Sequence, residues 1–363
     1  MQASFHLALF LTMAVSFASS VAQAQSRSHQ FELSPTSLEA TAVGNDKKAA
    51  RRMVVFDLMA RELPWSSKSL CEAALVFQHT NTEHEPDDGE QYRSQEMHLL
   101  AVALYKEAHR LGGGKPNTSF LGSHRYIVAM GLPRELSITN IEDPKTKELE
   151  LEPDRIGDQA RMRRGFPFAL YAYLQTENLD PIPHELRNSR RDEEVSKLCT
   201  ADQQTRALFR KDEMIFNRYI ERVGDAQRRA RLYEMMAEDV LWDVETMLNA
   251  AKVLNDTQSM IKERRKTRYL LQENHLFAYF LARQAFLKGE KSAAPLIVAS
   301  LNTYLKVSKM PEQFGLQMTE GASPKICQKD AHVSVEQWGK YEFPFHLGRS
   351  VKALCNAALS ASP

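Results

Sequence analysis

The stretch QEMHLLAVAL at Gln95–Leu104 returns 177 residues later as QENHLFAYFL at Gln272–Leu281. Each stretch opens with a polar Gln-Glu-x-His group and continues as a run that is apolar almost all round. A helix with such a run has no polar face to present to water, so it belongs in the centre of a bundle. The paired stretches therefore predict two central helices, one in each half of the chain.

The similarity between the two halves extends well beyond these stretches. Residues 49–112, placed on residues 226–289 without a gap, match at 19 of 64 positions, among them an arginine pair, a tryptophan and a glycine. The matched glycines, Gly112 and Gly289, lie where a C-capping glycine would end each central helix. After one inserted residue the match resumes, with Tyr126 on Tyr304 and Pro133 on Pro311. Self-similarity at a constant offset is typical of repeat architectures, so the sequence predicts a tandem duplication of a unit of about 100 residues.

The composition of both units favours helices. Ala, Leu, Met, Glu, Lys and Arg dominate, and apolar residues recur at helical spacing over 49–63, 69–78 and 95–111. Strand signals are scarce, and the best of them, at 119–128, suits a helix equally well. We expect an all-α protein of two tandem helical repeat units, packed as a bundle or short solenoid, with a helical linker and C-terminal tail.

Five parts follow along the chain. We expect a signal peptide at 1–24, a first helical repeat unit at 43–136, a linker with a helix at 137–221, a second helical repeat unit at 222–317 and a C-terminal tail at 318–363. The linker contains aromatic residues and a helical pattern over 158–175, and the tail ends in an apolar helix over 347–359. Both segments are expected to pack onto the bundle.

The N-terminus has the pattern of an export signal. Residues 1–24 contain no Lys, Arg, Asp or Glu, and the apolar run at 7–18 precedes Ala22-Gln23-Ala24, an A-x-A cleavage site. That run is too short to span a bilayer. We expect a periplasmic or secreted protein, cleaved near Ala24 and without a transmembrane segment in the mature chain. An uncleaved anchor is the alternative.

Four cysteines remain after the predicted cleavage, and an exported protein meets an oxidising compartment. The favoured pairing joins Cys327 with Cys355, because both lie in the tail, and then Cys71 with Cys199. Buried free thiols are the alternative.

The overall charge argues against one class of partner. The chain has 47 Lys+Arg against 46 Asp+Glu, a formal net charge of +1, and is 43% hydrophobic. A protein that grips nucleic acid by charge alone is strongly basic, and a disordered one is poor in apolar residues. We therefore expect no nucleic acid partner, and a ligand or protein partner of unknown identity.

Several short motifs resemble an uncharacterised bacterial family of helical domains of unknown function. The residues concerned are Val76–His79 and Arg125–Pro133 in the first unit and Tyr304–Gln317 in the second. Members of the family tend to read I-Q-H, then D-R-x-L-x-x-x-G-x-P-Q, then Y-G-T-Q. Neither copy has the whole pattern, because the first ends in Arg134-Glu135-Leu136 and the second has Asn255-Asp256 at the Q-H position. The resemblance implies a helical fold and no known activity.

The repeated Gln-Glu-x-His group and the Q-H pair supply the candidate site. On a helix the Gln and His of the group share a face, whereas the Glu points elsewhere. Candidate ligand-binding residues are Gln78, His79, Gln95, His98, Gln272, His275 and Gln317. The structural alternative is a set of satisfied hydrogen bonds at one end of the bundle. No metal-ligand spacing, phosphate loop or nucleophile elbow is found in the sequence, so we expect no metal and no cofactor.

The repeated arginine pairs, Arg51-Arg52 and Arg228-Arg229, have two interpretations. They cross-pair with acidic residues such as Asp57 and Glu234, or they bind an anion in a groove between the units.

The leading functional hypothesis is a binding or scaffolding role without catalysis, because helical repeats create grooves and no catalytic constellation is present in both copies. The alternative is a hydrolase-like enzyme with one site built mainly from the first unit. That site would use Gln78, His79, Gln95 and His98, completed by Gln313 and Gln317.

Overall fold

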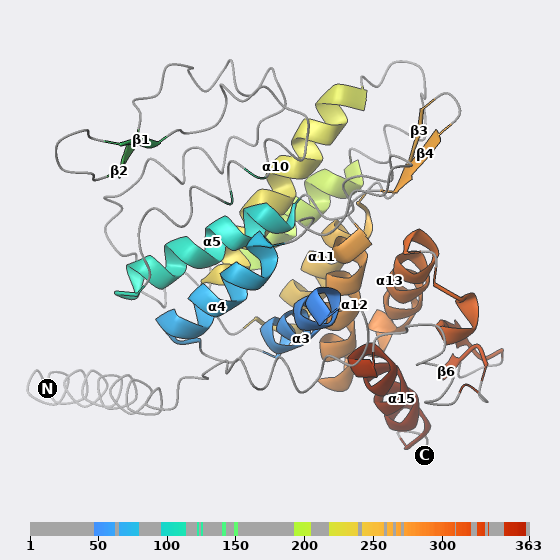
Figure 1. Ribbon diagram of the computed structural model, residues 1–363. Helices are drawn as coiled ribbons and strands as arrows, with labels where there is room; N and C mark the ends of the chain where they lie inside the picture. Colours follow the sequence, from blue (N-terminus) through green and yellow to red (C-terminus); the bar gives the residue numbers. More distant parts are fainter. Residues whose placement is uncertain are drawn as a thin grey trace, which may run out of the picture.

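The computed structural model shows an all-α bundle (Figure 1). The residues that it describes are 47–61, 65–79, 96–113, 122, 125, 140–142, 149–151, 192–204, 218–238, 242–257, 260–263, 266–269, 272–308, 310–320, 325–330, 333 and 345–360. The predicted signal peptide, the predicted linker helix over 158–175 and Gln95 lie outside these residues. The predicted fold class is confirmed.

The described part of the first half contains α3 (Lys47–Ala60), α4 (Ser67–Gln78) and α5 (Met97–Arg110). Helix α4 begins where the Ser66 hydroxyl accepts a hydrogen bond from the Ser69 backbone N–H at 3.1 Å. A serine in this position satisfies one of the donors left over at a helix N-terminus.

The second half contains three corresponding helices: α10 (Arg218–Ala237), α11 (Val244–Asn255) and α12 (Gln272–Leu287). The bounds of α11 are those of α4 shifted by 177. Its cap is equivalent as well, since Asp243 accepts from the Thr246 N–H at 2.6 Å. The offset found in the sequence therefore also relates the local structure of the two halves.

Both central helices end at a glycine in the left-handed region. The φ angle is 81° at Gly112, after α5, and 108° at Gly289, after α12. A residue with a Cβ is strained in this conformation, which is why glycine closes so many helices at this position. The two predicted C-capping glycines are confirmed.

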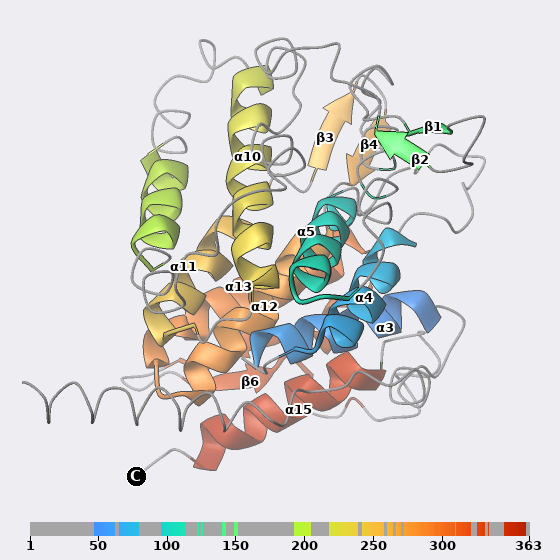
Figure 2. The same ribbon diagram turned by 90° about the vertical axis from the view of Figure 1, so that its left-hand side faces the viewer.

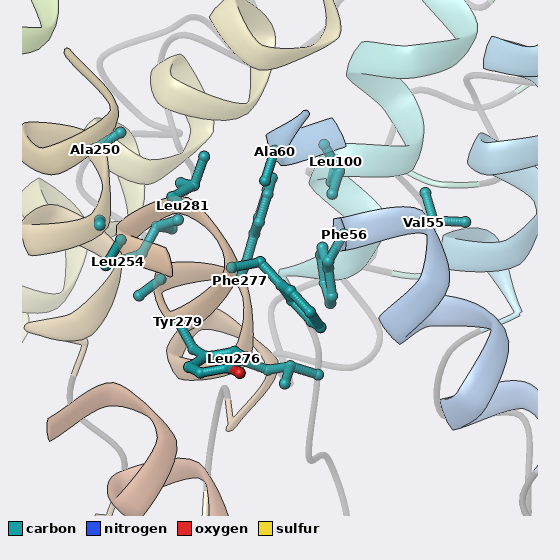
Figure 3. Close-up of a cluster of buried hydrophobic side chains, with 14 of the residues drawn as sticks. Val55, Phe56, Ala60, Leu100, Ala250, Leu254, Leu276, Phe277, Tyr279 and Leu281 are labelled. Carbon is teal, nitrogen blue, oxygen red and sulfur yellow. The ribbon is translucent and has the colours of Figure 1, made fainter. Parts of the chain in front are cut away.

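The first helix of each half packs against the central helix of the other half. Helix α3 contacts α12 and helix α10 contacts α5, while α4 stays with α5 and α11 stays with α12 (Figures 1 and 2). Figure 3 shows Phe56 of α3 beside Phe277 of α12, with ring centroids 4.6 Å apart and both side chains fully buried. One continuous apolar core thus joins the two halves.

The C-terminal part packs onto the second half. Helix α13 (Ala294–Val307) follows a 3-10 turn at Lys291–Ala293 and lies against α12. A second 3-10 turn at Glu312–Phe314 leads into strand β5 (Leu316–Met318), which pairs antiparallel with β6 (Ile326–Gln328).

Helix α15 (Phe345–Ser360) closes the bundle beneath α3 (Figure 2). His346 Nε2 lies 3.1 Å from Asp57 Oδ2, and Tyr279 and Ser350 share a hydroxyl hydrogen bond of 3.0 Å. The prediction that the tail packs onto the bundle is confirmed.

Short antiparallel ribbons supplement the helices. Strands β1 (Asn140–Glu142) and β2 (Leu149–Leu151) pair in one ribbon, and β3 (Met260–Glu263) and β4 (Lys266–Tyr269) pair in another. A further helix runs over 192–204. The sequence did not predict these ribbons, because three or four residues are too few to show an alternating pattern. Among the described helices, none combines the length and the apolar character needed to cross a membrane.

All four cysteines are free thiols in the structure, so neither predicted disulfide is present. Cys199 is buried, and the other three are partly buried. Cys355 and Cys327 are neighbours, because α15 packs on β6, and the pKa of the Cys355 thiol is raised to about 11 by burial and by Cys327.

Candidate functional site

The glutamates of the repeated Gln-Glu-x-His group pair across the two halves. Glu96 accepts two hydrogen bonds from Arg229, at 2.6 Å from Nε and 2.7 Å from Nη2, and both side chains are buried. Glu273 accepts from Arg52 Nε. Since Glu273 is Glu96 plus 177 and Arg229 is Arg52 plus 177, the two ion pairs are the same interaction made in both directions.

Other donors complete the surroundings of Glu96. Asn274 Nδ2 lies 3.0 Å from its carboxylate and the Tyr233 hydroxyl 3.3 Å, while Tyr233 also donates to Asn274 Oδ1 at 2.6 Å. Asn274 Nδ2 reaches Thr257 Oγ1 at 3.2 Å. A buried carboxylate needs this many partners to offset the loss of hydration. Phe56 occupies the position equivalent to Tyr233 and stacks on an aromatic ring instead.

A second set of charged residues also interacts across the two halves, once in each direction. Arg283 Nη1 lies 3.3 Å from Asp57 Oδ1, and the equivalent Lys106 and Glu234 interact electrostatically. Burial lowers the pKa of Lys106 to about 8 against the opposing effect of Glu234. Burial also raises the pKa of Glu234 to about 7, which the hydrogen bond from Arg231 opposes.

The predicted acidic partners of the arginine pairs were wrong, although cross-pairing itself was correct. Asp57 accepts from Arg61, Arg283 and His346 rather than from Arg228 or Arg229. Arg228 instead pairs with Asp202, at 3.4 Å, and with Asp225. The glutamates lie in the central helices of the opposite half, and the sequence alone does not show that α3 packs on α12 and α10 on α5.

The histidines of the repeated group are buried and neutral. His98 and His275 are each 2% exposed. Burial, followed by the charge of Arg125, lowers the pKa of His98 to about 3, and burial with Arg229 lowers that of His275 to about 4. A general base works best with a pKa near the operating pH, so neither imidazole suits acid–base catalysis at neutral pH.

In the first half, polar groups converge where α4 ends and α5 begins. The Tyr105 hydroxyl donates to Gln78 Oε1 at 2.8 Å, and Arg125 Nη1 donates to the Gln78 backbone carbonyl. Gln78 is buried, whereas His79 is exposed at the C-cap of α4. His79, Arg125 and Arg52 all act electrostatically on His98. The structure thus brings together three of the predicted residues, Gln78, His79 and His98.

The equivalent positions in the second half make internal contacts. Asn255, equivalent to Gln78, accepts from Ser300 Oγ at 2.9 Å, and Asp256, equivalent to His79, accepts from Gln203 Nε2 at 2.6 Å. Gln272 is partly buried at the start of α12. These contacts tie α11 to α13 and to the helix over 192–204.

Gln313 and Gln317 do not complete the first-half cluster. Gln317 is exposed on β5, and Figure 1 shows the β5–β6 region on the opposite side of the bundle from α4 and α5. The residues around it are structural, since Asn302 holds β5 by accepting from the Leu316 N–H at 3.0 Å and donating to its carbonyl at 2.8 Å. A Cβ on Gly315 would lie 2.3 Å from Asn302 Oδ1. Gln317 thus lies away from Gln78, His79 and His98, and the enzyme site of the alternative hypothesis stays a prediction.

Tyr105, Arg125, Tyr233 and Asn274 were missed by sequence reasoning. The comparison of the two halves could nevertheless have suggested the ion pairs, because the oppositely charged Arg52 and Glu96 both recur at the offset of 177. Tyr233 and Asn274 recur as Phe56 and Met97, so no repeat marks them.

Within the described part of the chain, no group of three or more His, Cys, Asp and Glu side chains is placed to hold a metal ion. Comparisons of the chain with protein-family models, with curated proteins and with solved structures found no match.

Proposed function

We propose that the chain is an exported binding or scaffolding protein that carries out no catalysis. One observation carries the proposal: the glutamates that recur in both halves form ion pairs that hold the halves together. Glu96 and Glu273 are held in reciprocal ion pairs, and the two histidines are buried in neutral form. Groups used in this way stabilise a fold and are not placed to transform a substrate.

The proposal includes a duplication whose halves exchange their first helices. Its support is the common offset of 177 shared by α4 and α11, by their caps and by the cross-paired charges. Such an exchange makes the interior of each half depend on the other half. The second half has become mainly a structural partner, since its equivalents of Gln78 and His79 bind neighbouring helices.

Export is supported by the charge-free N-terminus and its Ala22-Gln23-Ala24 site. Intact mass of protein recovered from the export compartment of its own host tests this directly. The expected mature chain begins at Gln25. A chain that retains Met1 would contradict the proposal.

Native mass spectrometry of the same sample tests the binding role. We expect a non-covalent ligand or a partner protein to remain on the mature chain. A retained small molecule would then be released, identified and incubated with fresh protein at a molar excess over the protein. A binding protein returns it chemically unchanged and bound at a fixed stoichiometry. Conversion of many molecules per chain would show an enzyme and refute the proposal.

A further inference from the structure

The polar cluster of the first half is held tightly against α5. A Cβ added to Gly122 would lie 2.8 Å from Val102 Cγ2 and 3.0 Å from the His98 carbonyl oxygen. The backbone at Gly122 therefore touches α5 directly, and Arg125, three residues further on, is anchored through its hydrogen bond to the Gln78 carbonyl. This packing positions a partly buried guanidinium beside the N-terminus of α5.

The charges that act on His98 all have the same sign. They come from Arg125, Arg52 and His79, and no carboxylate is among them. The N-terminus of α5, where His98 is the second residue, adds the positive end of the helix dipole. Among the described residues, no carboxylate forms an ion pair with Arg125. The cluster is therefore a region of positive potential in which no carboxylate of the described residues neutralises Arg125.

His98 carries a buried polar atom that the described residues leave unpaired. Its Nδ1 has no hydrogen-bond partner among them, and the side chain is only 2% exposed. Buried polar atoms are normally paired. In the tautomer that carries the proton on Nδ1, this atom is a donor for which the described residues supply no acceptor. His79, exposed next to it at the end of α4, places this region near the surface.

The second half provides an internal comparison. There Asp256 replaces His79, Thr303 replaces Arg125, and Ser300 replaces Gly122 and donates to Asn255. His275, the equivalent of His98, likewise has ring nitrogens that the described residues leave unpaired. Of the three positive groups, only Arg52 has a positive equivalent, Arg229, which acts on His275. The two copies therefore differ at His79 and Arg125, which supply the additional positive charge of the first.

We propose that Arg125, His79 and His98 bind the anionic group, a carboxylate or a phosphate, of a small molecule. This inference rests on the proposed binding role and names its ligand class. Arg125 supplies charged N–H donors, and a carboxylate or phosphate suits their planar fork. His98 donates from Nδ1 as a neutral imidazole. Arg52 stays paired with Glu273 and does not contact the anion; it contributes only its electrostatic effect near His98.

Isothermal titration calorimetry of the full mature chain tests this site, with inorganic phosphate and acetate as the probes in a chloride buffer. Phosphate represents a phosphate ligand and acetate a carboxylate ligand, so their relative affinities show which anionic group the site binds. We expect saturable binding of at least one of them to the wild type. Arg125→Gln should weaken that binding at least about tenfold, because a charge-assisted contact is lost.

Two further variants keep the test sharp. Arg110→Gln removes the same charge from the other end of α5, where Arg110 is 41% exposed and paired with Glu107, and it should change affinity by less than about twofold. Arg125→Lys keeps the charge and should retain part of the binding.

Absence of saturable binding of either anion to the wild type, or equal affinity in Arg125→Gln, would overturn the inference. If the native protein still carries a ligand in that case, the binding role survives and only this site is refuted.

Discussion

The reciprocal ion pairs make a quantitative prediction about stability. Arg229→Met removes a guanidinium that is 5% exposed and leaves the Glu96 carboxylate, 1% exposed, without its bidentate partner. Removing one member of a buried pair costs about 3–5 kcal/mol. We expect a loss of that size in the free energy of unfolding, and a similar loss for Glu96→Gln.

The double variant, Arg229→Met with Glu96→Gln, should lose much less than the sum of the two. A neutral glutamine can still accept hydrogen bonds from Tyr233 and Asn274, and no unpaired charge remains. The coupling energy should be at least about 2 kcal/mol. Lys197→Met is the matched control, because the Lys197–Glu193 pair is 72% and 66% exposed and such pairs contribute about 0–1 kcal/mol.

Urea denaturation followed by circular dichroism measures the wild type and the four variants under one set of conditions. Single losses no larger than that of the control, or losses that add within about 0.5 kcal/mol, would refute the reasoning. Such a result would mean that α10 does not pack on α5 as described.

Three other predictions follow from particular groups. The pKa values of His98 and His275 are lowered to about 3 and about 4, so the unfolded chain binds more protons than the folded chain below pH 6.5. The free energy of unfolding should therefore fall by up to about 1.4 kcal/mol per pH unit for each histidine as the pH drops from 6.5 towards 4. Urea titrations at several pH values should show a shallower pH dependence for a His275→Leu variant. Because Cys327 and Cys355 are neighbours, mild oxidation should join them, seen as the loss of two hydrogens by intact mass and a linked peptide after digestion, and a Cys327→Ser variant that still forms a linked pair would contradict this. Gly289→Ala should lower the free energy of unfolding by about 1–2 kcal/mol, because an alanine is strained at a φ of 108°. A Cβ there meets nothing within 4 Å, so backbone strain alone sets the cost. An unchanged melting temperature would show that the backbone relaxes at this position.

The sequence predicted the architecture well where apolar patterns were long. The two central helices are apolar almost all round, which left them no place except the middle of a bundle. The capping glycines at 112 and 289 and the tail helix were also predicted, because each depends on local chemistry. The short ribbons were not, since too few residues alternate in them to give a signal.

The site was predicted less completely for a physical reason. Gln78 and His98 were identified because they lie in repeated or recognisable motifs. The roles of Glu96 and Arg229 depend on which half supplies each helix, and an intramolecular exchange leaves the local pattern of both helices unchanged. Arg125 reaches the Gln78 carbonyl, and the nearby backbone at Gly122 packs on α5; no spacing rule reveals these tertiary contacts.

The exchange of first helices is the central claim, and separating the halves tests it most directly. The mature chain would be cut between Arg190 and Arg191 at the level of the gene, and the two pieces expressed alone and together. The account predicts that neither piece is a folded monomer on its own, because α3 needs α12 and α10 needs α5. Expressed together, they should purify as a stable one-to-one complex with the helix content of the intact protein. A single piece that folds as a stable monomer would contradict the account.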